Sequence, residues 1–301
     1  MSLLHPVARL SLSEFSVHPS TTIGIAIFAA AYIWRAKQGP AAADRLPVTV
    51  TATTADAGQL DMAAAPPGPT PAQRLAYFSS LALLFLTLNG PLHDLSDFYL
   101  FSGHMVQHLI LTLVVPPLMI FGTPGWMLRP VLRKAPLFAA ARKLTSITSC
   151  FVIFNVVLAL WHLPPLYNLA LANHGIHILQ HLMFIAASVL MWWPLLSPLP
   201  ELPRAAYPAQ MLYCFLMVIP MSIISIYIAM ADTLLYPAYA TAPRIMGITP
   251  MEDQQYGGLI MWIPGGVFFY AVMTVVFFKW ASRGEDTEES AQVGWVPKAT
   301  T

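Results

Sequence analysis

The sequence predicts an all-α integral membrane protein, a bundle of about seven transmembrane helices. Of its 301 residues, 57% are hydrophobic and only 10% are charged, whereas about a quarter of the residues of a soluble domain are charged. Apolar stretches of about 20 residues, the length that a helix needs to cross roughly 30 Å of hydrocarbon, recur along the chain. The predicted spans lie at residues 19–34, 75–90, 104–121, 147–162, 177–196, 209–230 and 257–280.

The first span is the shortest, because the apolar stretch from Thr21 to Trp34 is thin for a full crossing. A cleaved signal peptide is the competing interpretation. However, the only basic residue before the span is Arg9, while Arg35 and Lys37 follow it, which is the reverse of the signal-peptide pattern. We therefore expect a retained helix.

The distribution of Lys and Arg predicts the orientation in the membrane. All of these residues except Arg9 and Arg244 fall in the segments after spans one, three, five and seven. Basic residues are enriched on the cytoplasmic side of a membrane. We therefore expect the N-terminus and the loops after spans two, four and six to lie outside, and the C-terminus to be cytoplasmic.

Composition divides the chain into four parts. Residues 1–35 hold an N-terminal segment and the first span. Residues 36–73, rich in Ala, Pro, Thr and Gly, are expected to form a flexible cytoplasmic linker, because they cannot bury enough apolar surface to fold. Residues 74–281 form the transmembrane bundle, and the acidic residues 282–301 are expected to be a disordered cytoplasmic tail. Prolines inside the bundle, such as Pro116, predict kinked helices around a cavity.

Two spans carry the same histidine motif at their predicted outer ends. Residues 104–109 and 177–182 both read His-x-x-Gln-His-Leu. Residues four apart lie on one stripe of a helix, so each motif presents two imidazoles side by side, a spacing that suits a shared metal ion. Gln107 and Gln180 are expected to be hydrogen-bond partners that orient the histidines.

Other histidines fall at the same predicted end of the bundle. His162 ends span four, His174 lies three residues before the second motif, and His93 lies in the loop after span two, where a structural and a ligand role are equally supported. A single histidine at a helix end is usually an interfacial anchor, the interpretation that we accept for His5 and His18. Polar groups within a membrane are costly and usually functional. The predicted metal ligands are therefore His104, His108, His162, His174, His177 and His181.

The side chains also bear on which metal would bind. Imidazole suits zinc, copper, iron and nickel. Thioethers favour Cu(I), although methionine in an apolar helix is more often simple packing; four methionines lie toward the predicted outer side, Met105, Met230, Met251 and Met261. Cys150 and Cys214 fall near the cytoplasmic ends of their spans and are interpreted as buried structural cysteines.

The last predicted outer loop runs directly into span seven through the polar residues 252–256. Asp253 is expected to cap the helix of span seven, since acidic residues are favoured at a helix N-terminus. The pair Gly257-Gly258 is expected to allow close contact with a neighbouring helix.

With these motifs the chain resembles the CtaG family of multi-spanning cytochrome c oxidase assembly factors. The resemblance covers roughly residues 75–280 and rests on four motifs in the same order, at 104–108, 161–164, 177–181 and 253–264. It implies a non-enzymatic, multi-pass protein of the bacterial inner membrane that handles copper for a respiratory oxidase. The implied partners are cytochrome c oxidase subunits, membrane lipid and a periplasmic copper donor, with no nucleic acid.

Three other functions are compatible with parts of the pattern. The main alternative is a haem-binding membrane redox protein with bis-histidine ligation. A di-iron oxygenase would need more histidines on the cytoplasmic side, and an ion-coupled transporter would show a charged residue deep in a span. A Soret band would indicate haem, and metal analysis would separate copper from iron.

Overall fold

A computed structural model describes residues 15–40 and 68–293, with side chains up to Ser282. About 80% of the described residues are helical and none of them forms a strand, so the all-α prediction is confirmed. The helices are α1 (Pro19–Gln38), α2 (Pro71–Thr87), α3 (Pro91–Phe98), α4 (Phe101–Leu109), α5 (Val115–Gly122), α6 (Gly125–Leu132), α7 (Ala135–Leu144), α8 (Ile147–His162), α9 (Pro164–Ala172), α10 (His174–Leu196), α11 (Tyr207–Ala229) and α12 (Pro250–Val293), with a π-helix η2 (Ile110–Val114) and a 3₁₀ turn η3 (Pro237–Tyr239).

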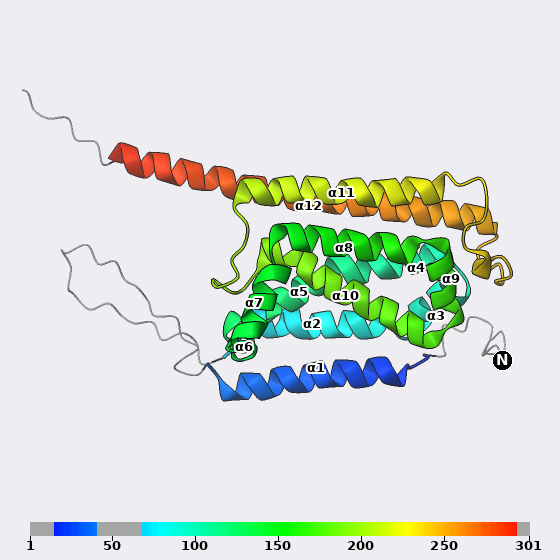
Figure 1. Cartoon of the computed structure of the whole chain (residues 1–301), viewed down its shortest axis with the longest axis horizontal. Helices are drawn as coiled ribbons and strands as arrows, with labels where there is room; N and C mark the ends of the chain where they lie inside the picture. Colours follow the sequence, from blue (N-terminus) through cyan, green and yellow to red (C-terminus); the bar gives the residue numbers. More distant parts are fainter. Residues whose placement is uncertain (1–14, 41–67, 294–301) are drawn as a thin grey trace, which may run out of the picture.

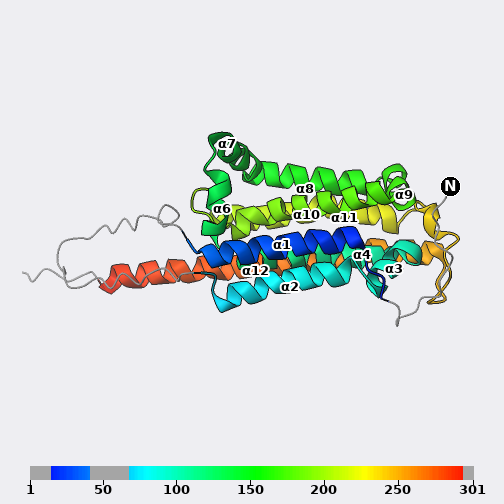
Figure 2. The same ribbon diagram turned by 90° about the horizontal axis from the view of Figure 1, so that it is seen from below.

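The long helices lie side by side along one axis (Figure 1). The short helices α3 and α9 lie at one end of the bundle, and α6 and α7 lie at the opposite end (Figures 1 and 2). The main core lies among α4, α8, α10, α11 and α12, and it is filled by large buried side chains such as Phe184, Met191, Met217 and Phe269.

Four unbroken helical stretches are long and apolar enough to cross a membrane: Phe101–Gly122, His174–Leu196, Tyr207–Ala229 and Pro250–Ser282. Two bent pairs would each add a span, α2 with α3 at 46° and α7 with α8 at 71°. Within the described part of the chain, this gives four to six candidate spans. The helix α1 is not among them, because polar residues at its start and two basic residues in its last turn lower its mean hydropathy. Seven spans and the orientation of the termini stay predictions.

Local sequence signals explain where several helices begin. The hydroxyl of Thr70 accepts a hydrogen bond from the Gln73 backbone N–H, and the Gln73 side chain accepts one from Thr70 N–H, a capping box at the start of α2. At the start of α8, the Ser146 hydroxyl accepts a hydrogen bond from the Ser149 backbone N–H. At the start of α10, the Asn173 side chain accepts from the backbone N–H groups of Gly175 and Ile176. These caps satisfy backbone donors that would otherwise lack partners at each helix start.

The proline pair in the third predicted span follows a π-helical segment that separates it from the first histidine motif. Pro116 has no N–H to bond to the carbonyl of Thr112, and the helix widens here into η2. The indole N–H of Trp192 on α10 donates to the carbonyl of Thr112 at 2.9 Å instead. Within a membrane such a freed carbonyl needs a protein partner, so this bond fixes α10 against the span that carries the first motif.

The helix α1 packs alongside α2, with the rings of Tyr32 and Tyr77 stacked at 4.0 Å between centroids. The Tyr32 hydroxyl donates to the carbonyl of Gly122 at 3.0 Å. The predicted linker is described only at its two ends, where α1 ends and α2 begins, since residues 41–67 lie outside the described residues.

The C-terminal tail differs from the prediction. Residues 282–301 were expected to be disordered, whereas α12 continues to Val293, and residues 294–301 lie outside the described part. The sequence between Ser282 and Val293 contains no proline and several good helix formers, Glu, Gln and Ala among them. It therefore propagates a helix that α12 has already nucleated.

Candidate metal centre

The two histidine motifs meet at the end of the bundle where α3 and α9 lie. The rings of His104 and His108 on α4 stack at 4.3 Å between centroids, and those of His177 and His181 on α10 lie 4.5 Å apart. Across the two helices, His104 lies 6.1 Å from His177, and His108 lies 5.6 Å from His181. His162, at the end of α8, lies 6.4 Å from His108. We call these five residues the histidine cluster.

The cluster is buried, and its ring nitrogens are unusually short of partners. None of the five residues is more than 7% exposed. Both nitrogens of His104, His108 and His181, and Nε2 of His162 and His177, are buried without a hydrogen-bond partner among the described residues. Leaving one such group unsatisfied costs about 1–3 kcal/mol. A set of convergent lone pairs of this kind fits a bound cation.

Hydrogen bonds fix the orientation of two of these rings. Nδ1 of His162 lies 2.7 Å from the carbonyl of Leu158, which only accepts, so Nδ1 carries the proton and Nε2 presents its lone pair. Nδ1 of His177 lies 3.3 Å from Oδ2 of Asp97. A carboxylate behind an imidazole orients the ring and raises its basicity as a ligand.

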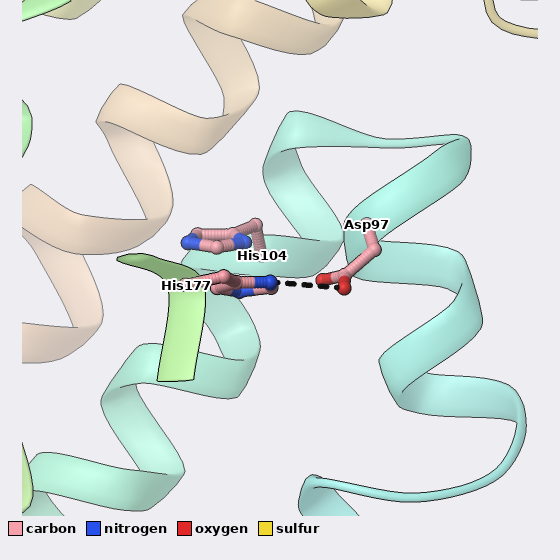
Figure 3. A group of neighbouring side chains, drawn as sticks. All are labelled: Asp97, His104 and His177. Carbon is pink, nitrogen blue, oxygen red and sulfur yellow. Dashed lines mark ion pairs between the residues drawn. The ribbon is translucent and has the colours of Figure 1, made fainter. Parts of the chain in front are cut away.

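Asp97, which the sequence analysis did not identify, completes one side of the cluster. Its carboxylate and the rings of His104 and His177 offer ligand atoms that all lie within 4.8 Å of one another. Figure 3 shows His177 directed at Asp97, with the ring of His104 beside it. Oδ2 of Asp97 also lies 3.5 Å from Nε2 of His93 on the same face of α3. The i,i+4 spacing of His93 and Asp97 was the signal in the sequence that could have found this residue.

The two motif glutamines differ in role. The Gln107 amide donates to the carbonyl of Thr87 at 2.8 Å and lies 3.0 Å from Nδ1 of His93, while its oxygen accepts from the Ser96 hydroxyl. Gln107 therefore holds α2, α3 and α4 together and orients His93 rather than a histidine of its own motif. The amide oxygen of Gln180 is buried with no hydrogen-bond partner among the described residues.

His174 lies apart from the cluster. It is exposed at the start of α10, and its nearest imidazole neighbour among the ring contacts is His18 at 6.1 Å. His18 itself lies against His93, with ring centroids 4.5 Å apart. The segment that holds His18 is fixed over the mouth of the cluster, because the Ser16 hydroxyl donates to Asp94 at 2.9 Å and His18 N–H donates to Asn89 at 2.7 Å. His5 lies outside the described residues.

Three tyrosines form the wall on the side of α9 and the loop before α12. The hydroxyl of Tyr236 donates to the carbonyl of His162 at 2.9 Å, and that of Tyr239 donates to the carbonyl of Ser96 at 2.7 Å. Tyr167 lies 2.9 Å from Tyr239, oxygen to oxygen. Burial raises the pKa of Tyr236 and of Tyr239 above the usual value for a phenol, so both remain protonated donors.

A small cavity of about 20 Å³ lies beneath His108 and His162. Met105, Met221 and Met261 contribute to its lining. Of the four methionines singled out from the sequence, Met105 and Met261 therefore reach the cluster, whereas the side chain of Met230 is 76% exposed. The free thiols Cys150 and Cys214 are both buried, and they lie on the halves of α8 and α11 that point toward α7 (Figure 1).

Asp253 caps a different helix from the one expected. Its carboxylate accepts from the backbone N–H of Phe101 at 2.7 Å and of Ser102 at 3.1 Å, so it caps α4. The start of α12 is capped instead by reciprocal hydrogen bonds between Thr249 and Glu252. Asp253 thus ties α12 to the helix that carries the first motif.

The family model described as cytochrome c oxidase caa3 assembly factor (Caa3_CtaG) matches residues 57–283. The chain belongs to this family. No curated protein and no solved structure matched the chain. The match includes the histidine cluster and Asp97, whereas α1 and the segment over the mouth of the cluster lie outside it.

One end of this caa3 assembly factor therefore holds five buried imidazoles, one carboxylate and three thioethers. Imidazole and thioether ligands suit soft or borderline transition metals. Five histidines with available ring nitrogens and an acidic neighbour have the chemistry to hold such a metal ion.

Proposed function

We propose that this caa3 assembly factor binds copper as cargo at the histidine cluster and passes it to the oxidase. The observation that carries the proposal is the set of buried ring nitrogens without partners, contributed by three different helices. A fold retains such groups where a ligand satisfies them. The neighbouring thioethers of Met105 and Met261 favour copper in its Cu(I) state over zinc.

The role is that of a carrier, not of an enzyme. The partners are the oxidase subunits that receive copper and a periplasmic donor that supplies it, with lipid around the helices. The chain lies in the bacterial inner membrane, and the cluster faces the periplasm. The basic helices α6 and α7 lie at the end of the bundle opposite α3 (Figure 1), which supports this orientation by the positive-inside rule.

The haem alternative has less support. Opposed imidazoles of α4 and α10 approach to 5.6 Å between centroids, and the cavity beneath them holds about 20 Å³. That volume suits a single ion or water molecule rather than a porphyrin.

The test compares oxidase maturation in a strain that lacks this chain after complementation with three forms. Wild type and His174→Ala, a matched change at an exposed histidine of α10, are expected to restore oxidase activity and the copper content of the purified oxidase. The His104→Ala/His181→Ala variant is expected to restore neither, although equal amounts reach the membrane. Full restoration by the double variant would overturn the proposal.

A further inference from the structure

We propose that the histidine cluster is two metal sites rather than one, stacked one helical turn apart. The mouth site consists of Asp97, His104 and His177. The deep site consists of His108, His162 and His181, and it takes Cu(I). The inference rests on the proposed function, because it treats copper as the cargo.

The repeated motif produces two layers. In each motif the second histidine lies one turn below the first, and a turn of α-helix rises 5.4 Å. The first histidines of the two motifs face each other at 6.1 Å, and the second histidines face each other at 5.6 Å. Each layer gains a third residue from another helix: Asp97 from α3 at the mouth and His162 from α8 below. The ligand atoms of the mouth set all lie within 4.8 Å of one another. In the deep set the ring of His108 lies 6.4 Å from that of His162 and 5.6 Å from that of His181, so these three side chains must turn toward one another to share an ion.

The number of available donors exceeds what one ion accepts. Eight nitrogens of the five imidazoles are buried without a partner among the described residues, and Asp97 adds a carboxylate. A tetrahedral ion accepts four ligands. One ion would therefore engage at most four of these nitrogens, whereas two ions with three protein ligands each would engage one atom from every residue of both layers.

The two layers differ in chemical softness. The mouth site includes a carboxylate, an oxygen donor that suits divalent ions such as Zn²⁺ and Cu²⁺. The deep site has only imidazoles, and the cavity beside it is lined by the thioethers of Met105, Met221 and Met261. Soft donors of this kind select Cu(I). The cavity of about 20 Å³ is large enough for one ion or one water molecule.

The layered arrangement suits transfer in steps. The side chain of Asp97 is 12% exposed, whereas the three histidines of the deep site are 5–7% exposed, so the mouth site is the first that an arriving cation meets. His104 and His108 stack at 4.3 Å, which lets an ion exchange one imidazole for the next without leaving protein ligands. The ion that moves is Cu(I) at both layers, so no electron is transferred, and the carboxylate makes the mouth site the weaker of the two for this ion.

The experiment counts metal per chain in the detergent-purified full-length protein by native mass spectrometry and elemental analysis. Wild type saturated anaerobically with Cu(I) is expected to hold two copper ions. Asp97→Asn/His177→Leu is expected to keep one, and His108→Leu/His162→Leu is expected to keep one. With Zn²⁺, which three imidazoles also bind, the mouth variant is expected to hold its ion more weakly than the deep variant, which keeps the carboxylate of Asp97. His174→Leu and Cys150→Ser/Cys214→Ser are expected to keep both copper ions.

The failures of the two proposals differ in outcome. One copper per wild-type chain, abolished by either pair of substitutions, would overturn the two-site inference and leave the copper-carrier function standing. No copper in wild type would overturn both.

If a layer variant fails to fold, as judged by gel filtration and thermal unfolding, wild type is loaded with Zn²⁺ and then Cu(I). A mixed species with one ion of each is expected, and complete exchange of zinc for copper would contradict two sites of different softness.

Discussion

At the scale of single residues, the histidine cluster holds most of the buried side-chain polar atoms that lack a partner in the described part of the chain. Eight of its ring nitrogens are of this kind, each at a cost of about 1–3 kcal/mol. Gln107, in contrast, bonds Thr87, Ser96 and His93 beside the cluster. Open ligand atoms held by a hydrogen-bonded neighbour are typical of a preorganised binding site.

Asp253 offers a residue-scale prediction about stability. It is completely buried, and its carboxylate accepts from two backbone N–H groups at the start of α4. Asp253→Asn replaces one acceptor oxygen by a donor, so we expect the free energy of unfolding to fall by about 1–3 kcal/mol. Thermal unfolding in detergent measures the change. The matched control, Asp232→Asn at an exposed loop position, should leave the transition in place, and equal behaviour of the two variants would contradict the capping role.

The same scale shows what the sequence could reveal about the site. The i,i+4 histidine spacing predicted that imidazoles would pair on each helix, and the rings do so. Asp97 and the contact of His18 with His93 depend on how α3 and the segment before α1 fold back. The i,i+4 spacing of His93 and Asp97 shows that these two side chains share a face of α3, but no periodicity shows that this face returns to the histidine cluster.

At the scale of elements, glycines on α12 set the distance between helices. A Cβ added to Gly258 would lie 2.8 Å from the backbone nitrogen of Ala229 and 2.9 Å from the carbonyl of Ser225, both on α11. Backbone atoms cannot move aside as a flexible side chain can. The close contact expected from the sequence pair Gly257-Gly258 is therefore present in the structure.

We expect Gly258→Ala to force α11 and α12 apart and to lower the free energy of unfolding by about 1–3 kcal/mol, the usual cost of overpacking. The control is Gly24→Ala in α1, where an added Cβ meets nothing within 4 Å and where alanine favours a helix. Thermal unfolding of both variants in the same detergent distinguishes them. A Gly258→Ala protein as stable as Gly24→Ala would show that the helices separate without cost.

Element boundaries were predictable where apolar stretches end in clear signals, as for α8, whose bounds of 147 and 162 match the predicted span. They were not predictable where tertiary contacts decide. Pro116 indicates that the carbonyl of Thr112 lacks its helical donor, but the donor that replaces it, Trp192, comes from another helix. Composition alone predicted that the residues after 282 are unordered, whereas the backbone there continues the helix α12 to Val293.

At the scale of the whole molecule, the histidine cluster and the basic helices lie at opposite ends of the bundle (Figures 1 and 2). Each end of the bundle has an exposed residue that can be labelled. Lys143 on α7 is exposed at the basic end, and Met246 in the loop before α12 is 69% exposed at the other end. Basic residues face the cytoplasm. The predicted orientation therefore puts Met246 and the cluster outside.

Cysteine labelling tests this orientation in a Cys150→Ser/Cys214→Ser background. Met246→Cys in intact cells is expected to react with a membrane-impermeant thiol reagent, and Lys143→Cys is expected to react only after the membrane is opened. The reverse pattern would place the cluster in the cytoplasm and would contradict delivery from a periplasmic donor.

Copper K-edge X-ray absorption of the wild-type protein, loaded anaerobically with Cu(I), would show whether imidazoles of the histidine cluster hold the copper. We expect nearest-neighbour nitrogen scatterers with the multiple scattering that imidazole rings produce, and the loss of this signal in the His104→Ala/His181→Ala variant. A spectrum dominated by sulfur neighbours that survives this double substitution, or a protein that retains no copper, would contradict this expectation.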